Sequence, residues 1–183
     1  MLAYLFWHWP ENPAEASGYE AGLAAFQTQL VATGSEGFHG AASYRVEGAG
    51  WLPGGRGYED WYLLDGSFAL DPLNQIAVSP DLRAAHDRPA LAAGGGAGGL
   101  YRLIEDRQAP EAPTAGTWFS KPKRLRYPEF YELAAEFTQA PGRSFWRRQM
   151  VLGPAPEFCL LGDDWPDLPM DWSPIRVTRT AVR

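Results

Sequence analysis

The chain begins with a run of apolar residues that leaves no polar face. Residues 3–9 read AYLFWHW and are followed by Pro10, which cannot donate a hydrogen bond to a sheet. Both alternating faces of this predicted strand are apolar, so both sides of its sheet must be covered. A helix is predicted next, over residues 14–33, because apolar residues recur there at helical spacing: Tyr19, Leu23, Phe26 and Leu30.

The pattern from residue 38 to residue 105 predicts a hairpin, a broken helix and a further strand. Two strands, over residues 38–47 and 58–64, are joined by a connection rich in Gly and Pro. A helix over residues 72–93 is predicted to break at Ser79-Pro80. The run of glycines at 94–99 is predicted to end the helical structure, with a strand starting at Leu100. The predicted order is βαββαβ.

The second part of the chain repeats this pattern after a Pro-containing linker. Residues 117–122, TWFSKP, resemble FWHWP at 6–10, and a Tyr-Glu pair follows nine residues after the proline in both places. Each pair opens an Ala-rich helix, and a strand candidate over residues 145–152 comes next in the second part. Prolines and aspartates between Gly162 and Pro174 make a full helix there unfavourable, and a last strand follows at 175–182.

The repeated order of elements resembles the dimeric α/β-barrel superfamily of ferredoxin-like proteins, which includes EthD-like proteins and antibiotic-biosynthesis-type monooxygenases. The resemblance implies an α+β fold in which two tandem βαββαβ units form one barrel within a single chain. The second unit has its second helix reduced to a loop. We expect the first unit at 1–107, a linker at 108–116 and the second unit at 117–183. The resemblance also implies a small-molecule pocket between the two sheets.

Composition narrows the classes of function and partner. The chain has 16 basic and 22 acidic residues, a net charge of −6, so we expect no nucleic-acid partner and no membrane binding. The single cysteine excludes an intrachain disulfide, and no residue spacing indicates a metal site. The apolar runs are too short to span a bilayer and the start lacks a signal-peptide pattern, so we expect a cytoplasmic protein. Two lysines against fourteen arginines are typical of a GC-rich bacterial genome.

The candidate catalytic residues are His8 and Tyr44. An imidazole at the end of the first strand could act as a general acid or base, or could simply hydrogen-bond a backbone carbonyl. Ser120 or Lys121 is expected at the corresponding place in the second half. His8 or His86 could alternatively ligate haem, although the second half has no histidine; we therefore expect no cofactor and leave haem open.

The candidate ligand-binding residues are arginines and aromatics. Arg45 and Arg148, in corresponding strands, could hold an anionic group, or could point outward into ion pairs. The aromatic side chains could line a pocket for a flat ligand or could form core: Trp7, Trp9, Trp61, Trp118 and Trp146.

Three functions remain open at this point. The superfamily resemblance implies a small-molecule-binding protein, with cofactor-independent monooxygenase or isomerase chemistry on a small aromatic or anionic compound as the enzymatic hypothesis. The alternatives are a non-catalytic ligand-binding or interaction protein with an aromatic core, and a haem-binding protein. A fused pair of units could be a monomer, or could pair further into a homodimer.

Overall fold

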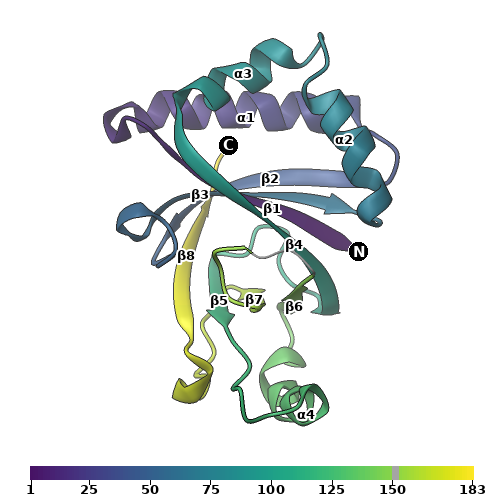
Figure 1. Ribbon diagram of the computed structural model, residues 1–183, viewed down its shortest axis with the longest axis vertical. Helices are drawn as coiled ribbons and strands as arrows, with labels where there is room; N and C mark the ends of the chain where they lie inside the picture. The colour runs from purple at the N-terminus through teal and green to yellow at the C-terminus, as the bar shows by residue number, and fades with distance from the viewer. Residues whose placement is uncertain (150–152) are drawn as a thin grey trace.

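Eight antiparallel strands close into a barrel in the computed structural model, which describes residues 1–149 and 153–183 (Figure 1). The strands are arranged around the barrel in the order β1-β3-β2-β8-β5-β7-β6-β4. Their bounds are β1 (Leu2–Pro10), β2 (Phe38–Glu47), β3 (Arg56–Leu64), β4 (Ala93–Arg107), β5 (Ala115–Phe119), β6 (Arg143–Arg148), β7 (Phe158–Gly162) and β8 (Ile175–Ala181). The α-helices are α1 (Ala16–Thr33), α2 (Leu70–Ala77), α3 (Arg83–Ala92) and α4 (Tyr127–Thr138).

The two halves of the chain contribute neighbouring strands in the same relative order. In the first half the fourth strand neighbours the first, which neighbours the third and then the second: β4-β1-β3-β2. The second half repeats this order as β8-β5-β7-β6. Two pairs join the halves: β2 with β8, where Tyr44 faces Ala181, and β4 with β6, where Tyr101 faces Arg148. The strands of one chain are therefore enough to close the barrel.

The helices form separate outer layers on the two halves. Helices α1, α2 and α3 lie over the outer face of the β1–β4 sheet, whereas α4 lies at the far end of the molecule over the second half (Figure 1). Residues 163–174, all of which the structure describes, contain only a 3-10 turn at Met170–Trp172 where the first half has α2 and α3. The three prolines there account for this difference, since each removes a helix hydrogen-bond donor.

Strand β1 is buried on both faces, as its sequence predicts. Leu5 and Trp7 point into the barrel, where they belong to the core that both halves share. Tyr4 and Phe6, on the other face, pack beneath the helical layer. The spacing of α1 is also confirmed, because Tyr19, Leu23, Phe26 and Leu30 are its buried apolar side chains.

The glycine run at 94–99 belongs to a strand, so the prediction that the strand starts only at Leu100 is wrong, whereas the helical structure does end before the run, at Ala92. It forms the first part of β4 and pairs with β1, with Gly96 opposite His8 and Gly99 opposite Leu5. A Cβ atom at Gly96 would lie 2.4 Å from Cζ of Phe6, and one at Gly95 would lie 2.5 Å from Cζ2 of Trp9. The aromatic rings of β1 occupy the space that side chains on β4 would need, which is why glycine suits this strand.

Three other predicted boundaries can be compared with the structure. The break in the helical segment is confirmed, because α2 and α3 are separated at residues 78–82. Strand β5 begins at Ala115, inside the segment predicted as a linker. Strand β6 ends at Arg148, before the predicted end at 152, and residues 150–152 lie outside the described residues. Within the described ranges, no helix is both long and apolar enough to cross a membrane.

Candidate functional site

A cavity of about 430 Å³ lies between the first-half sheet and its helical layer. Its floor is the outer face of β1 and β3, and its walls come from α1, α2 and α3. The lining is mainly apolar and aromatic, with Phe6, Phe26 and Leu73 among its residues. A concave apolar space of this size with a few polar groups is typical of a small-molecule site.

The main polar feature of the cavity lining is a buried histidine and carboxylate pair. His8 on β1 and Asp60 on β3 are 1% and 3% exposed, and both line the cavity. Nε2 of His8 lies 3.3 Å from Oδ1 of Asp60. The contact does not have hydrogen-bond geometry, and Nε2 has no hydrogen-bond partner among the described residues. A buried polar atom without a partner is costly, so Nε2 is suited to an interaction that a ligand supplies.

Asp60 is fixed by hydroxyl groups on its own sheet. Ser43 on β2 donates to Oδ1 at 2.5 Å, and the Tyr62 hydroxyl donates to Oδ2 at 3.0 Å. Gln27 of α1 donates to both of these hydroxyl oxygens, at 3.1 and 3.3 Å. The carboxylate is therefore oriented before any ligand arrives, and it can stabilise positive charge on His8.

Two tyrosines hold the imidazole of His8 in place. Nδ1 lies 2.7 Å from the hydroxyl of Tyr19 on α1, and the Tyr58 ring stacks on the imidazole at 5.6 Å between centroids. Burial, with Asp60 nearby, raises the pKa of Tyr19 and holds the pKa of Tyr62 well above its usual value. Both phenols are therefore neutral near pH 7, where each can donate or accept a hydrogen bond.

The arrangement is chemically suited to proton transfer. A neutral imidazole beside a fixed carboxylate can take a proton, because the carboxylate stabilises the imidazolium that forms. The burial of both side chains strengthens this charge interaction, because the local dielectric is lower than that of water. General base catalysis on a bound small molecule is therefore the reaction step that the site can perform.

The cavity lining does not fit haem. His86 lines the cavity, but its Nδ1 lies 2.9 Å from the Asp87 carboxylate, while both ring nitrogens of His8 face Tyr19 and Asp60. No lysine or arginine occurs among the described lining residues to pair with the propionates of a haem. Haem propionates would therefore lie beside the Asp60 and Asp71 carboxylates without a cation among the described lining residues to pair with.

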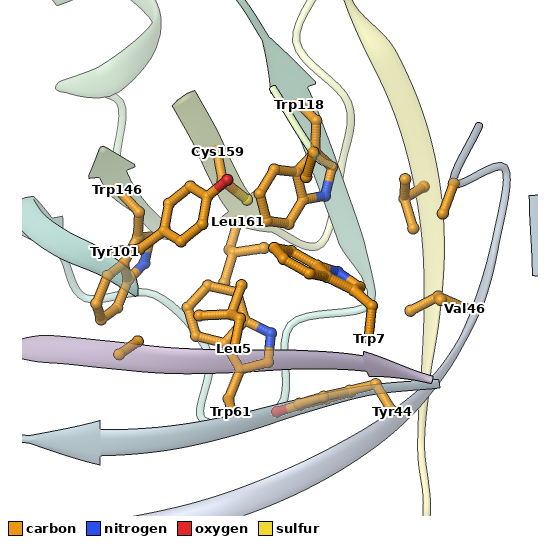
Figure 2. Close-up of a cluster of buried hydrophobic side chains, with 14 of the residues drawn as sticks. Leu5, Trp7, Tyr44, Val46, Trp61, Tyr101, Trp118, Trp146, Cys159 and Leu161 are labelled. Atoms are coloured by element: carbon orange, nitrogen blue, oxygen red, sulfur yellow. The ribbon is translucent and has the colours of Figure 1, made fainter. Parts of the chain in front are cut away.

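The aromatic residues expected to bind a ligand lie instead in the barrel interior, except for Trp9 at its edge. Trp7 and Trp118 meet edge-to-face at 5.6 Å between centroids, and Trp61 meets Trp146 at 5.2 Å (Figure 2). Trp9 is only partly buried and packs against the same cluster. These side chains pack on one another, which is the core alternative of their two interpretations.

Tyr44 also lies in the barrel interior, away from His8. The guanidinium of Arg179 stacks 3.7 Å from the Tyr44 ring centroid and makes a fully buried ion pair with Glu59, at 3.1 Å. Glu59 also accepts hydrogen bonds from the indole nitrogens of Trp7 and Trp61. This interior network links β3 to β8, so it connects the two halves of the chain.

The structure places neither candidate arginine at the cavity. Arg45 is half-exposed and forms an ion pair with Glu20 at 3.1 Å. Arg148 donates to the backbone carbonyls of Gly153 and Ala155. Of the residues singled out from sequence, His8 alone combines burial with a place in the cavity lining.

The predicted counterpart of His8 in the second half also needs correction. His8 faces Tyr58 in the β1–β3 ladder, and Phe119 faces Phe158 in the β5–β7 ladder. Trp7 and Trp118, the residues before them, both point into the barrel. Phe119, and neither Ser120 nor Lys121, therefore occupies the position of His8.

Sequence reasoning missed Asp60 and Tyr19, which complete the site. A usable signal was the Glu59-Asp60 pair at the centre of an otherwise aromatic strand, because buried carboxylates need a partner. Tyr19 carried no such signal, since its helical spacing is also that of a core residue.

Comparison with known proteins gives fold relatives only. No family model and no curated protein matches the chain. The whole chain aligns with the solved structure of a putative monooxygenase from Fusobacterium nucleatum, with TM-score 0.62, 10% identity and 92% of that chain covered. It also aligns over its whole length with an anthrone oxidase-like protein, with TM-score 0.50, 13% identity and 91% coverage of that chain. The chain thus shares the fold of two proteins that carry oxygenase and oxidase names.

Proposed function

We propose that this chain is a small-molecule enzyme whose active site is the cavity beneath α1–α3. The observation that carries the proposal is the buried His8–Asp60 pair in the lining of an apolar cavity of about 430 Å³. The reaction is cofactor-independent and of the monooxygenase or isomerase type, and it begins when His8 takes a proton from a small aromatic compound. The names of the two fold relatives support this choice of chemistry.

The two reaction types share the proton removal and differ in the fate of the carbanion. In an isomerase, His8 returns the proton to another atom of the same carbanion. In a monooxygenase, the carbanion formed at an activated CH₂ group reacts with O₂, and loss of water from the hydroperoxide leaves a carbonyl. That reaction balances as CH₂ + O₂ → C=O + H₂O and needs no further reductant.

The charges around the cavity favour an uncharged substrate over an anionic one. Asp60 and Asp71 both contribute carboxylates to the lining, and its described residues include no lysine or arginine. An anion would lie beside these carboxylates without a cation to pair with, which costs free energy in an apolar site. The substrate class we propose is therefore a neutral aromatic compound with an acidic C–H or O–H group.

We further propose that the two halves are tandem ferredoxin-like units and that the chain acts as a monomer. The strand order repeated in both halves supports the first statement, and closure of the barrel within one chain supports the second. The first unit then carries the site and the second contributes half of the barrel.

Oxygen uptake with anthrone tests the enzymatic proposal, because anthrone carries an activated CH₂ group and is uncharged. We expect the protein to accelerate O₂ consumption and to form anthraquinone. His8→Gln should lower the rate by about 10²- to 10⁴-fold, the usual contribution of a positioned general base. The matched control is His39→Gln, which removes the histidine of an exposed His39–Asp65 pair outside the cavity and should leave the rate unchanged.

Other outcomes separate the alternatives. An unchanged rate in His8→Gln would contradict the proposed catalytic role. Anthrone binding without oxygen uptake would favour the non-catalytic ligand-binding protein. A Soret band on titration with haem, lost in His8→Gln or His86→Gln, would favour the haem-binding alternative and contradict a cofactor-independent reaction.

A further inference from the structure

Tyr19 forms part of the wall between the cavity and the outer surface. Tyr19 lines the cavity that contains His8, and it is also a lining residue of a separate surface depression. That depression is formed by the end of β1 and the first turn of α1 on one side, with Arg88 and Leu91 of α3 on the other. Tyr19 itself is only 4% exposed, so the two spaces meet at this one buried side chain.

The hydroxyl of Tyr19 is also in direct contact with the proposed base. It lies 2.7 Å from Nδ1 of His8, a hydrogen bond within the buried interior. Tyr58 offers an informative contrast: its ring stacks on His8, but its hydroxyl donates to Glu20 instead. Tyr19 therefore makes the hydrogen-bonded contact on the side of the imidazole that faces away from Asp60.

We propose that Tyr19 is a proton relay that connects His8 to solvent in the surface depression. A proton received at Nε2 of His8 leaves the imidazolium with protons on both ring nitrogens. The Nδ1 proton then passes to the Tyr19 oxygen while the Tyr19 hydroxyl proton passes to water outside. Both groups are then neutral, with the proton of His8 on Nε2 instead of Nδ1, and one proton has crossed the wall. Nε2 becomes a base again when it returns its proton to the reacting molecule and Nδ1 takes a proton back from the Tyr19 hydroxyl, which is refilled from water.

The environment of Tyr19 supports a relay through a neutral hydroxyl. Burial, followed by the neighbouring Asp60 and Tyr58, raises the pKa of Tyr19, so the phenol keeps its proton at neutral pH. A neutral hydroxyl both accepts and donates, whereas a phenolate would hold the proton from His8. The relay gives His8 a route for proton exchange on the side of the imidazole that faces Tyr19, separate from the cavity itself.

Solvent exchange of the His8 ring proton tests the relay in the free protein, by NMR with ¹⁵N-labelled histidine. Tyr19→Phe keeps the ring in the wall but removes the hydroxyl, and we expect exchange to slow by about 100-fold, the lower range for a positioned proton-transfer group. Tyr127→Phe is the matched control, because it removes a phenol hydroxyl in the second half that lines neither the cavity nor the depression. Exchange in that variant should equal that of the unmodified protein.

A second variant tests the outer end of the route. Gly18 lines the depression beside Tyr19, and a Cβ atom there would meet nothing within 4 Å. Gly18→Leu should cover Tyr19 from solvent and slow exchange, and Gly18→Ala should have a much smaller effect. Unchanged exchange in both Tyr19→Phe and Gly18→Leu would overturn the relay, as would equal slowing in Tyr127→Phe.

The relay serves the proposed function, but the two can fail separately. The exchange measurement uses no substrate, so its result does not depend on whether anthrone is oxidised. Slow exchange in Tyr19→Phe together with no oxygen uptake would establish the relay and reject the oxidase reaction. Unchanged exchange together with His8-dependent uptake would reject the relay alone.

Discussion

In both halves of the chain, helices cover the outer face of corresponding strands. The space between strands and helices differs, because it contains a cavity in one half and is filled with side chains in the other. Beneath α1–α3 the sheet carries polar groups and a cavity of about 430 Å³. Beneath α4 the sheet carries a packed cluster of buried side chains: Phe119, Phe130, Ala134, Phe145, Phe158, Leu160, Leu168 and Trp172. Phenyl rings pack closely there, and the ring centroids of Phe130 and Phe158 are 4.7 Å apart.

The strand ladders show the change position by position. Asp60 faces Ser43 across β2 and β3, and the same place in β6 and β7 holds Phe145 and Leu160. His8 corresponds in the same way to Phe119. His8, Asp60 and Ser43 are thus replaced by apolar residues at the corresponding places in the second half.

The packed half and the cavity-containing half therefore contribute differently to the stability of the protein. A buried polar pair stabilises less than well-packed apolar groups of similar volume, and a cavity forgoes dispersion contacts. The second half gains those contacts, and the first half keeps a space for a ligand. We infer that the second half contributes stability that the first half lacks.

The largest effect is expected from opening a hole in the packed layer. Phe158→Ala removes a ring at 0% exposure that contacts Phe119, Phe130 and Phe145, so it should lower the free energy of unfolding by about 3–5 kcal/mol. Urea denaturation measures this change. The corresponding residue of the first half provides the control, because Tyr58→Phe keeps the ring and removes only a hydroxyl. A loss below about 1 kcal/mol for Phe158→Ala would show that the second layer is not tightly packed.

A smaller change in the free energy of unfolding, of opposite sign, is expected when the polar pair of the first half is replaced by the residue types that occupy the corresponding places in the second half. His8→Phe combined with Asp60→Leu should leave the free energy of unfolding unchanged or raise it by about 1–4 kcal/mol, as found when buried ionic groups are replaced by apolar ones. Ser43 and Tyr62 keep Gln27 as a partner in this variant. The single variant Asp60→Leu should be less stable than the double one, because it leaves His8 without its carboxylate. Oxygen uptake with anthrone should be lost in both variants. A double variant that is clearly less stable than the unmodified protein would contradict the comparison between the two halves.

The features of the fold that depend on local pattern could be predicted from sequence. The double-sided burial of β1, the buried face of α1 and the missing helix near Pro169 all result from periodicity and proline chemistry. The glycine run could not be assigned in this way. Its role in β4 depends on the rings of Phe6 and Trp9 on a neighbouring strand, so tertiary contacts override its local preference.

The candidate site was predictable only in part, for a similar reason. Alternation identifies His8 and Trp7 as lying on opposite faces of β1, but it does not say which face meets the barrel interior and which meets the helices. The partner of His8 lies on β3 and is brought to it by strand pairing, far along the sequence. The resemblance implies a pocket between the sheets, whereas the cavity that His8 lines is on the outer side of β1.

The smallest effect concerns the tyrosines around the cavity and appears only at alkaline pH. Burial raises the pKa of Tyr4, Tyr19 and Tyr62, and burial together with Glu20 raises the pKa of Tyr58 to about 12. The unfolded chain ionises its tyrosines near the ordinary value of 10.0 while the folded layer stays neutral. Stability is therefore fully present below pH 10 and falls as the pH rises toward 12, because protons are lost from the unfolded state first.

Urea midpoints between about pH 9 and about pH 11.5 measure this decline, and tyrosinate absorbance reports the ionisation itself. Tyr58→Phe should make the decline shallower, since it removes one of the groups that the fold keeps neutral. Tyr127→Phe is the matched change in the second half, where the ring is 38% exposed, and it should alter the decline much less. A stability that stays level across this range would mean that the layer around the cavity admits phenolates, which would contradict the raised tyrosine pKa values of the first half.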